Sequence, residues 1–152
     1  MRYASTLFVV EDIARSKDFY TRVLGQKIEV DFGKNVGFVG GFAIHQKAHF
    51  QALIGGRSIA ARGNDAELYF EHDDVQGIEA ELAKAGGEFI HSTREEPWRQ
   101  RVLRLYDPDG HIIEIGESMA FLCSRLAKEG LTVEETSKAT GLTVDMVRGF
   151  LR

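Results

Sequence analysis

A glycine-containing turn followed by an alternating strand brings one carboxylate into a position suited to chemistry. The segment Asp107–Gly110 reads Asp-Pro-Asp-Gly, in which proline fixes φ and glycine tolerates a positive φ, as tight turns require. In the strand pattern that follows, Ile113 and Ile115 share one face and Glu114 lies on the other. An ionised carboxylate is costly to bury without a partner such as a cation. Glu114 is therefore the first candidate for a ligand-binding or metal-binding residue.

A second candidate site lies just before this turn. The segment 95–101, Glu-Glu-Pro-Trp-Arg-Gln-Arg, holds the only tryptophan of the chain. The ring of Trp98 and the amide of Gln100 are suited to lining a small-molecule pocket. Arg104 alternates with two leucines in the next strand pattern, so if the leucines are buried, Arg104 points away from the core and could meet an anionic substrate group. The alternative is a surface loop in which Trp98 covers an edge of the protein.

An internal repeat predicts the elements that position these residues. The runs Ser5–Ile13 and Glu67–Val75 begin 62 residues apart and share one form, a short apolar run that ends in acidic residues. A helical pattern follows each run and ends at Gly25 or Gly87, with the same offset. The alternative is a chance similarity between two αβ units, which would have to reproduce the same 62-residue offset without a gap. Each copy is expected to fold as β-α-β-β-β, with later strands at 27–32, 36–39 and 42–46, then 88–91, 101–106 and 111–116.

Composition and charge exclude several classes of protein. The 152 residues are 43% hydrophobic and 28% charged, and the net charge of −4 provides no basic field for nucleic acid. No apolar run approaches the roughly 18 residues of a membrane span, and residues 1–6 lack the apolar core of a signal peptide. The single Cys123 cannot form an internal disulfide, which suits a reducing compartment. We therefore expect a cytoplasmic protein without a nucleic-acid or membrane partner.

The repeat and its closing motif resemble the vicinal oxygen chelate superfamily, which includes glyoxalase I, fosfomycin-resistance and bleomycin-resistance proteins, extradiol dioxygenases and methylmalonyl-CoA epimerase. The most specific shared features are Asp12, Phe19-Tyr20, Leu24-Gly25, Asp107–Gly110 and Glu114. The resemblance implies an α+β fold in which two βαβββ modules, about 3–54 and 65–118, form a concave sheet cavity within a glyoxalase-like domain 1–118. The linker between the modules is expected near residues 55–64.

The resemblance also implies four ligand positions, on the first and last strands of each module. In this sequence they are occupied by Ser5, His45, Glu67 and Glu114. A serine hydroxyl is a poor ligand for a divalent ion, whereas one imidazole and two carboxylates form a known metal-binding set. The resemblance thus implies a divalent ion (Zn, Ni, Co, Mn or Fe) on His45, Glu67 and Glu114, with Ser5 beside the substrate and Glu67 or Glu114 as catalytic base.

Two functions are compatible with these residues. In the first, a metal-dependent enzyme of lyase, isomerase or dioxygenase type chelates a small oxygen-rich substrate and stabilises a developing oxyanion. In the second, Glu67 and Glu114 pair with arginines, and the cavity binds a drug or metabolite without metal. Alternation places Tyr69 on the face of Glu67 and adds it to the substrate-binding candidates. The other histidines are expected to be surface or hydrogen-bonded residues: His49, His72, His91 and His111.

Residues 119–152 lie outside the repeat and are expected to form a helical extension. One apolar stripe ends near Gly130, Thr132 opens a second helix with a capping box that ends at Gly141, and Thr143 opens a third helix. The order resembles a helix-turn-helix. However, five basic and four acidic residues give a net charge of only +1, too little for DNA binding. We expect the extension to pack on the domain or to contribute to a homodimer.

Overall fold

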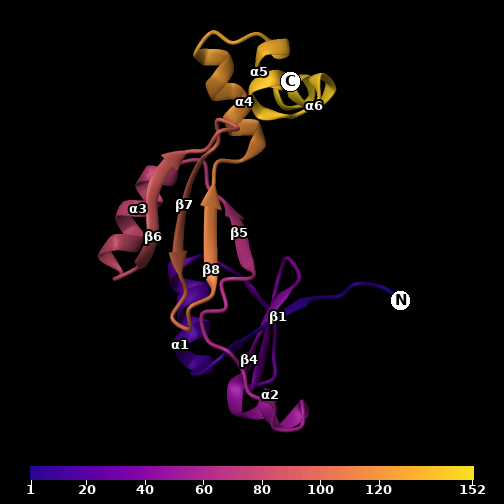
Figure 1. The fold of residues 1–152 in the computed structure, drawn as a ribbon, viewed down its shortest axis with the longest axis vertical. Helices are drawn as coiled ribbons and strands as arrows, with labels where there is room; N and C mark the ends of the chain where they lie inside the picture. The colour runs from indigo at the N-terminus through magenta and orange to yellow at the C-terminus, as the bar shows by residue number, and fades with distance from the viewer. The chain divides into compact units, whose positions relative to one another are not determined.

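Two four-stranded sheets, one from each copy of the repeat, organise the computed structural model, which describes residues 1–152 (Figure 1). The chain forms two units: unit 1 contains Met1–Ala66 and Tyr106–Ile112, and unit 2 contains Glu67–Leu105 and Ile113–Arg152. The expected α+β class with two modules is confirmed. None of the helices has the length and apolar character that crossing a membrane requires.

The sheet of unit 1 has the strand order β1-β4-β3-β2. Strand β1 runs parallel to β4, and the other neighbours are antiparallel. Its strands are β1 (Thr6–Val10), β2 (Ile28–Asp31), β3 (Asn35–Phe38) and β4 (Phe42–Gln46). The β2–β3 register shifts between Ile28 and Val30, which places Val30 on the same face as Gly37, whose missing Cβ leaves room for the Val30 side chain.

Two helical segments of unit 1 differ in how well the sequence predicts them. Helix α1 (Ile13–Asp18) begins at Asp12, whose carboxylate accepts the N–H groups of residues 14 and 15, and it continues as the π-helical turn η1 (Phe19–Val23). Helix α2 (Lys47–Leu53), which directly follows β4, was not expected from the sequence. The residue before it, Gln46, is the N-cap and makes no side-chain capping bond, so the sequence carries no signal for the start of this helix.

One face of the first sheet is buried and the other is open. Tyr20 of η1 is fully buried, and its ring centroid lies 5.5 Å from that of Phe38 and 5.3 Å from that of Phe42. Phe38 and Phe42 stack on each other with centroids 4.6 Å apart. On the opposite face, Val30 and Phe32 remain 37% and 74% exposed. This open face also carries His45, discussed below.

The Asp-Pro-Asp-Gly turn is part of unit 1, where its two aspartates hold α1 and η1. The Asp107 carboxylate is completely buried and accepts hydrogen bonds from the Tyr20 hydroxyl at 2.8 Å, from His111 Nδ1 at 2.9 Å, and from two backbone N–H groups of the turn. Asp109 accepts bonds from the Ser16 hydroxyl at 2.6 Å and from Arg15 at 2.9 Å. The Asp-Pro-Asp-Gly motif therefore forms a turn and also anchors α1 and η1 through its two carboxylates.

Opposing effects set the protonation of the Asp107–His111 pair. Burial raises the pKa of Asp107, but hydrogen bonds from His111 and Tyr20 and the charge of His111 outweigh it, so that the pKa is lowered. Burial lowers the pKa of His111, but its hydrogen bond to Asp107 and the charge of Asp107 raise it overall. Protonated His111 therefore stabilises the fold below about pH 6.5, and this stability is lost as the pH rises through the higher folded pKa of His111.

Replacing Asp107 by asparagine is expected to reduce the free energy of unfolding by about 1–2 kcal/mol, because one acceptor oxygen of a buried, fully used carboxylate becomes a donor. Urea unfolding at pH 5.5 and pH 8 tests this. The wild type should lose stability across that range, and Asp107→Asn should lose less, because its His111 has no anionic partner. Equal pH dependence in both proteins would contradict the assigned pairing.

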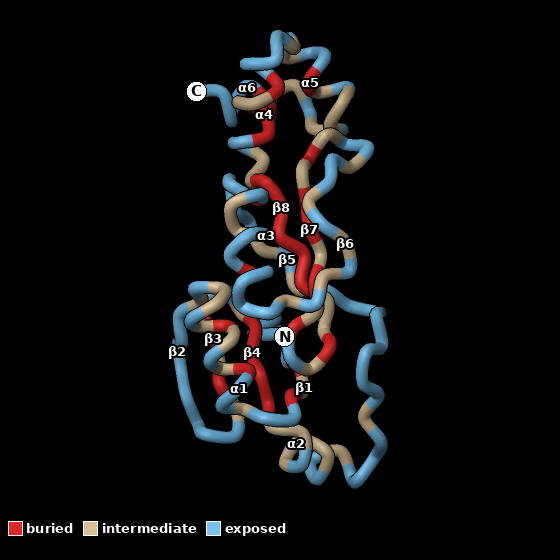
Figure 2. Tube along the Cα trace, turned by 90° about the vertical axis from the view of Figure 1, so that its left-hand side faces the viewer, coloured by how far each residue is buried: buried red, intermediate tan, exposed pale blue.

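Unit 2 holds the second module and the C-terminal helices. Its sheet has the order β5-β8-β7-β6, and helix α3 begins after Asp74, whose carboxylate caps Gly77 N–H. Figure 2 shows the buried residues concentrated along β7, β8 and part of α4. The elements are β5 (Glu67–Glu71), α3 (Val75–Lys84), β6 (Glu88–Glu95), β7 (Arg101–Tyr106), β8 (Ile112–Gly116), α4 (Met119–Lys128), α5 (Val133–Thr140) and α6 (Val144–Phe150).

The three C-terminal helices begin and end as the sequence predicts. Thr132 and Glu135 form the capping box of α5, Gly141 ends that helix with a φ of 78°, and Thr143 caps α6. Helix α4 buries Leu122, Cys123 and Leu126. The extension is thus a helical bundle within unit 2.

Candidate functional site

The open face of the second sheet carries a row of polar side chains, one from each strand. Glu67 on β5, Glu114 on β8, Arg104 on β7 and His91 on β6 follow the spatial order of the strands. Arg104 donates from Nε to Glu67 at 3.1 Å and from Nη2 to Glu114. Its Nη1 lies 3.3 Å from both His91 Nε2 and Glu96 Oε1. These five residues form the Arg104 cluster.

One guanidinium serves three carboxylates in this cluster. The side chain of Glu114 is only 8% exposed, that of Arg104 is 21% exposed, and that of Glu67 is 41% exposed. Arg94 also pairs with Glu96 at 3.0 Å, so two cations face three carboxylates and the net charge is −1. All the nitrogens of the Arg104 guanidinium already have partners in this chain. The cluster therefore offers carboxylate acceptors to a ligand more readily than it offers a free cation.

A second group on this face, the Trp98 cluster, comprises Trp98, Gln100 and Tyr69. Gln100 is 3% exposed. Its amide donates to the Tyr69 hydroxyl at 2.9 Å and to the Glu117 carbonyl at 2.7 Å, and its oxygen accepts the Trp98 indole N–H at 2.9 Å. Tyr69 and Trp98 remain 45% and 40% exposed. The buried amide thus fixes two aromatic rings whose outer surfaces are available to a ligand.

Gly116 joins the two clusters, because it lies two residues after Glu114 on the same face of β8. A Cβ at this position would meet the Gln100 amide nitrogen at 2.8 Å, the Tyr69 ring at 3.1 Å and Val102 at 3.2 Å. Gln100 and Tyr69 therefore occupy the space left by the missing side chain. The Arg104 cluster and the Trp98 cluster form one continuous site.

Gly116→Ala is expected to displace the Gln100 amide and to lower the free energy of unfolding by about 1–3 kcal/mol, as overpacking of a closely filled site does. The displacement should also shift the fluorescence of the only tryptophan, Trp98. Gly149→Ala, on α6 with no atom near the added methyl group, is the matched control. A Gly116→Ala protein with unchanged stability and fluorescence would contradict the described packing.

In unit 1, the open face of the first sheet carries His45 with both ring nitrogens engaged. Asn35 Nδ2 lies 3.1 Å from His45 Nδ1, and His49 Nδ1 lies 2.7 Å from His45 Nε2. The two imidazoles stack with centroids 4.9 Å apart. Burial, with a smaller effect of the His49 charge, lowers the pKa of His45. His45 is therefore neutral at neutral pH.

The donor atoms expected for a divalent ion already have partners within the chain. Glu67 and Glu114 share the Arg104 guanidinium, so a cation on these oxygens would compete with Arg104. Ser5 is exposed and precedes β1, and the β1 residue opposite His45 is Val9. Neither unit contains a group of three His, Cys, Asp or Glu side chains arranged for a metal. Neither unit by itself provides the donor set of a resident metal ion.

Several residues of these clusters were not singled out from the sequence. Glu96 reaches the Arg104 cluster because β6 extends to Glu95, beyond the expected end at residue 91. Only residues 96–100 then connect β6 to β7, and a 2.8 Å hydrogen bond from Glu96 N–H to the Gln100 carbonyl closes this turn. His91 follows from the same extension. His49 reaches His45 because α2 places it one helical turn after β4. Predicting these three residues from the sequence would have required the correct length of β6 and the presence of α2.

Comparison with known proteins agrees with this architecture. Residues 3–120 match the family model of the glyoxalase-like domain. A protein of unknown function from Agrobacterium tumefaciens is 44% identical over 78% of this chain and 95% of its own, with a TM-score of 0.71. A glyoxalase-related enzyme from Fulvimarina pelagi is 21% identical over 78% of this chain and 88% of its own, with a TM-score of 0.68, and so supports the fold alone. No curated protein matches the sequence.

Proposed function

Because the chain belongs to the glyoxalase-like domain family, whose fold serves enzymes and binding proteins alike, we propose that it binds a small molecule without a metal ion. The proposed site is the open face of the second sheet, where the Arg104 cluster meets the Trp98 cluster. The observation that carries this proposal is the ion pairing of Arg104 with both Glu67 and Glu114. Arg104 supplies there the positive charge that a metal ion would otherwise supply.

The chemistry of the site selects a class of ligand. Glu67 and Glu114 offer acceptor oxygens close together, and the negative surplus of the cluster disfavours an anion. The exposed rings of Tyr69 and Trp98 offer stacking surfaces. A neutral planar molecule with neighbouring hydroxyl groups matches all three properties.

Trp98 fluorescence provides the test, since this residue is the only tryptophan. Catechol should quench it, and the matched anion 3,4-dihydroxybenzoate should bind about fivefold or more weakly, because two like charges near 4 Å cost about 1 kcal/mol even in water. EDTA should change neither result. Glu67→Gln should weaken catechol binding, whereas Glu81→Gln on the exposed side of α3 should not. Tighter binding of the anion, or loss of binding in EDTA, would overturn the proposal.

A divalent-metal-dependent enzyme is the second candidate, with His45, Glu67 and Glu114 as ligands and Glu67 or Glu114 as base. The surplus of carboxylates in the Arg104 cluster favours it, because this surplus would attract a cation. Lyase, isomerase and dioxygenase reactions belong to this candidate. A homodimer and a cytoplasmic location are further proposals, which light scattering after size-exclusion chromatography and cell fractionation would test.

A further inference from the structure

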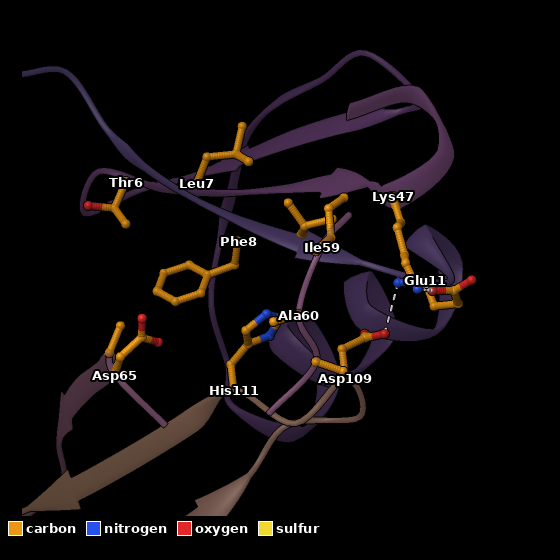
Figure 3. Close-up of a pocket in the computed structure, with 13 residues that line it drawn as sticks. Thr6, Leu7, Phe8, Glu11, Lys47, Ile59, Ala60, Asp65, Asp109 and His111 are labelled. Atoms are coloured by element: carbon orange, nitrogen blue, oxygen red, sulfur yellow. Dashed lines mark hydrogen bonds and ion pairs between the residues drawn. The ribbon is translucent and has the colours of Figure 1, made fainter. Parts of the chain in front are cut away.

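Unit 1 contains a cavity of about 310 Å³ at the β1 edge of its sheet (Figure 3). It lies along β1, beneath the segment 59–66 that connects the two modules, and the Asp-Pro-Asp-Gly turn closes one side. Its apolar lining includes Leu7, Phe8 and Ile59, with alanines at 60, 61 and 66 that leave the space open. This volume lies at the lower end of the roughly 300–1,000 Å³ typical of small-molecule sites.

Most of the charged groups that line this cavity have partners. Lys47 pairs with Glu11 at 2.7 Å, Asp109 pairs with Arg15 at 2.9 Å, and His111 donates to the buried Asp107 at 2.9 Å. These groups form the polar end of the cavity (Figure 3). Because their charges are matched within the chain, they leave no net charge for a ligand at that end.

Asp65 is the exception among the charged lining residues. Its carboxylate has no hydrogen-bond or ion-pair partner, and it sits at the end of the cavity where the Phe8 ring lies (Figure 3). Phe8 is held in place by edge-to-face contact with His111, with centroids 5.1 Å apart. A carboxylate beside an aromatic ring attracts a cation in two ways, by ion pairing and by cation–π attraction.

We propose that this cavity is a second small-molecule site, which binds a primary amine attached to a compact apolar group. The ammonium group pairs with Asp65 next to the ring of Phe8. The apolar part lies against Ile59 and the alanines. The site is independent of the open face of the second sheet, so it does not depend on the function proposed above.

Phenethylamine is a suitable probe, with 2-phenylethanol as the uncharged molecule of the same shape. In amide NMR titrations of the full chain, phenethylamine should shift the signals of β1 and of residues 59–66, and it should bind about fivefold more tightly than the alcohol, as an ion pair supported by an aromatic ring allows. Asp65→Asn should remove this preference. Glu29→Gln, an equal charge change on exposed β2 away from the cavity, should keep it.

The titration also separates this proposal from the first one. Ala60→Phe, which fills the cavity without adding a second tryptophan, should abolish the shifts on β1, while catechol quenching of Trp98 in unit 2 should be unaffected. The proposal is overturned if phenethylamine shifts no signals of β1 or residues 59–66. It is equally overturned if the amine and the alcohol bind with equal affinity, or if Asp65→Asn binds the amine as well as the wild type does.

Discussion

Arg125→Met is expected to lower the free energy of unfolding by about 3–5 kcal/mol at neutral pH, because it leaves a buried carboxylate without its cation. Arg125 on α4 binds Glu117 through two nitrogens, each 2.9 Å from a carboxylate oxygen. The side chains are 10% and 1% exposed. Once the guanidinium is removed, Glu117 keeps only the Arg101 N–H at 3.1 Å. This pair ties the C-terminal helices to the second sheet.

Urea unfolding followed by circular dichroism would measure this loss. Arg148→Met is the matched control, since its pairing with Glu134 is 53% and 66% exposed and exposed pairs contribute about 0–1 kcal/mol. Adding Glu117→Met to Arg125→Met should recover most of the stability, because no buried charge remains unpaired. Unfolding of Arg125→Met and Arg148→Met at the same urea concentration would contradict the assigned role of the Arg125–Glu117 pair.

Arg104→Met is expected to lower the free energy of unfolding by about 2–3 kcal/mol at pH 7, below the range for fully buried pairs because Arg104 and Glu67 are partly solvated. Without the guanidinium, the nearly buried Glu114 lies beside Glu67 with no cation between them, and the pKa of Glu114 should rise. The loss should therefore shrink at acidic pH, as Glu114 takes up a proton. The variant should also bind Mn²⁺ or Co²⁺ more tightly than the wild type, because both carboxylates become free.

Unfolding curves at pH 7 and pH 5, with metal titrations of the same samples, test these expectations. Arg94→Met is the control, because Arg94 is 56% exposed and its partner Glu96 keeps Arg104. The control should lose less than about 1 kcal/mol and should gain no metal affinity. If Arg104→Met matched this control in stability and in metal binding, the central place of Arg104 in the site would be wrong.

Local signals in the sequence were sufficient for most elements of the fold. The 62-residue repeat, the glycines that end the helices and the alternation of Leu103, Arg104 and Leu105 all act within a few residues, and the strands β4 and β7 begin and end where these signals predict. Helix α2 is an exception, because it has no capping side chain. The extension of β6 to Glu95 is another, because the hairpin turn and not the composition of the strand fixes its end.

The partners of the site residues were harder to predict. Alternation places Glu67, Glu114 and Arg104 on one face of the sheet. It does not predict whether the carboxylates bind an arginine or a metal ion, because either cation can bind to the same oxygens. The order of the strands, β5-β8-β7-β6, places Arg104 beside Glu114, and the two side chains form an ion pair. The partners of Asp107 were equally hard to predict. The turn that contains Asp107 is evident from the sequence, but the hydrogen bond that Asp107 accepts from Tyr20 joins residues 87 positions apart, which no local pattern indicates.

The metal content of protein purified without chelators distinguishes a metal-free site from a metal centre. Elemental analysis of the wild type and of His45→Ala would be compared at equal protein concentration. Because Arg104 pairs with both Glu67 and Glu114, and because His45 is bonded to Asn35 and His49, we predict far less than one equivalent of any divalent metal in both proteins. Near-stoichiometric Zn, Ni, Co, Mn or Fe in the wild type that is lost in His45→Ala would contradict the proposed metal-free site.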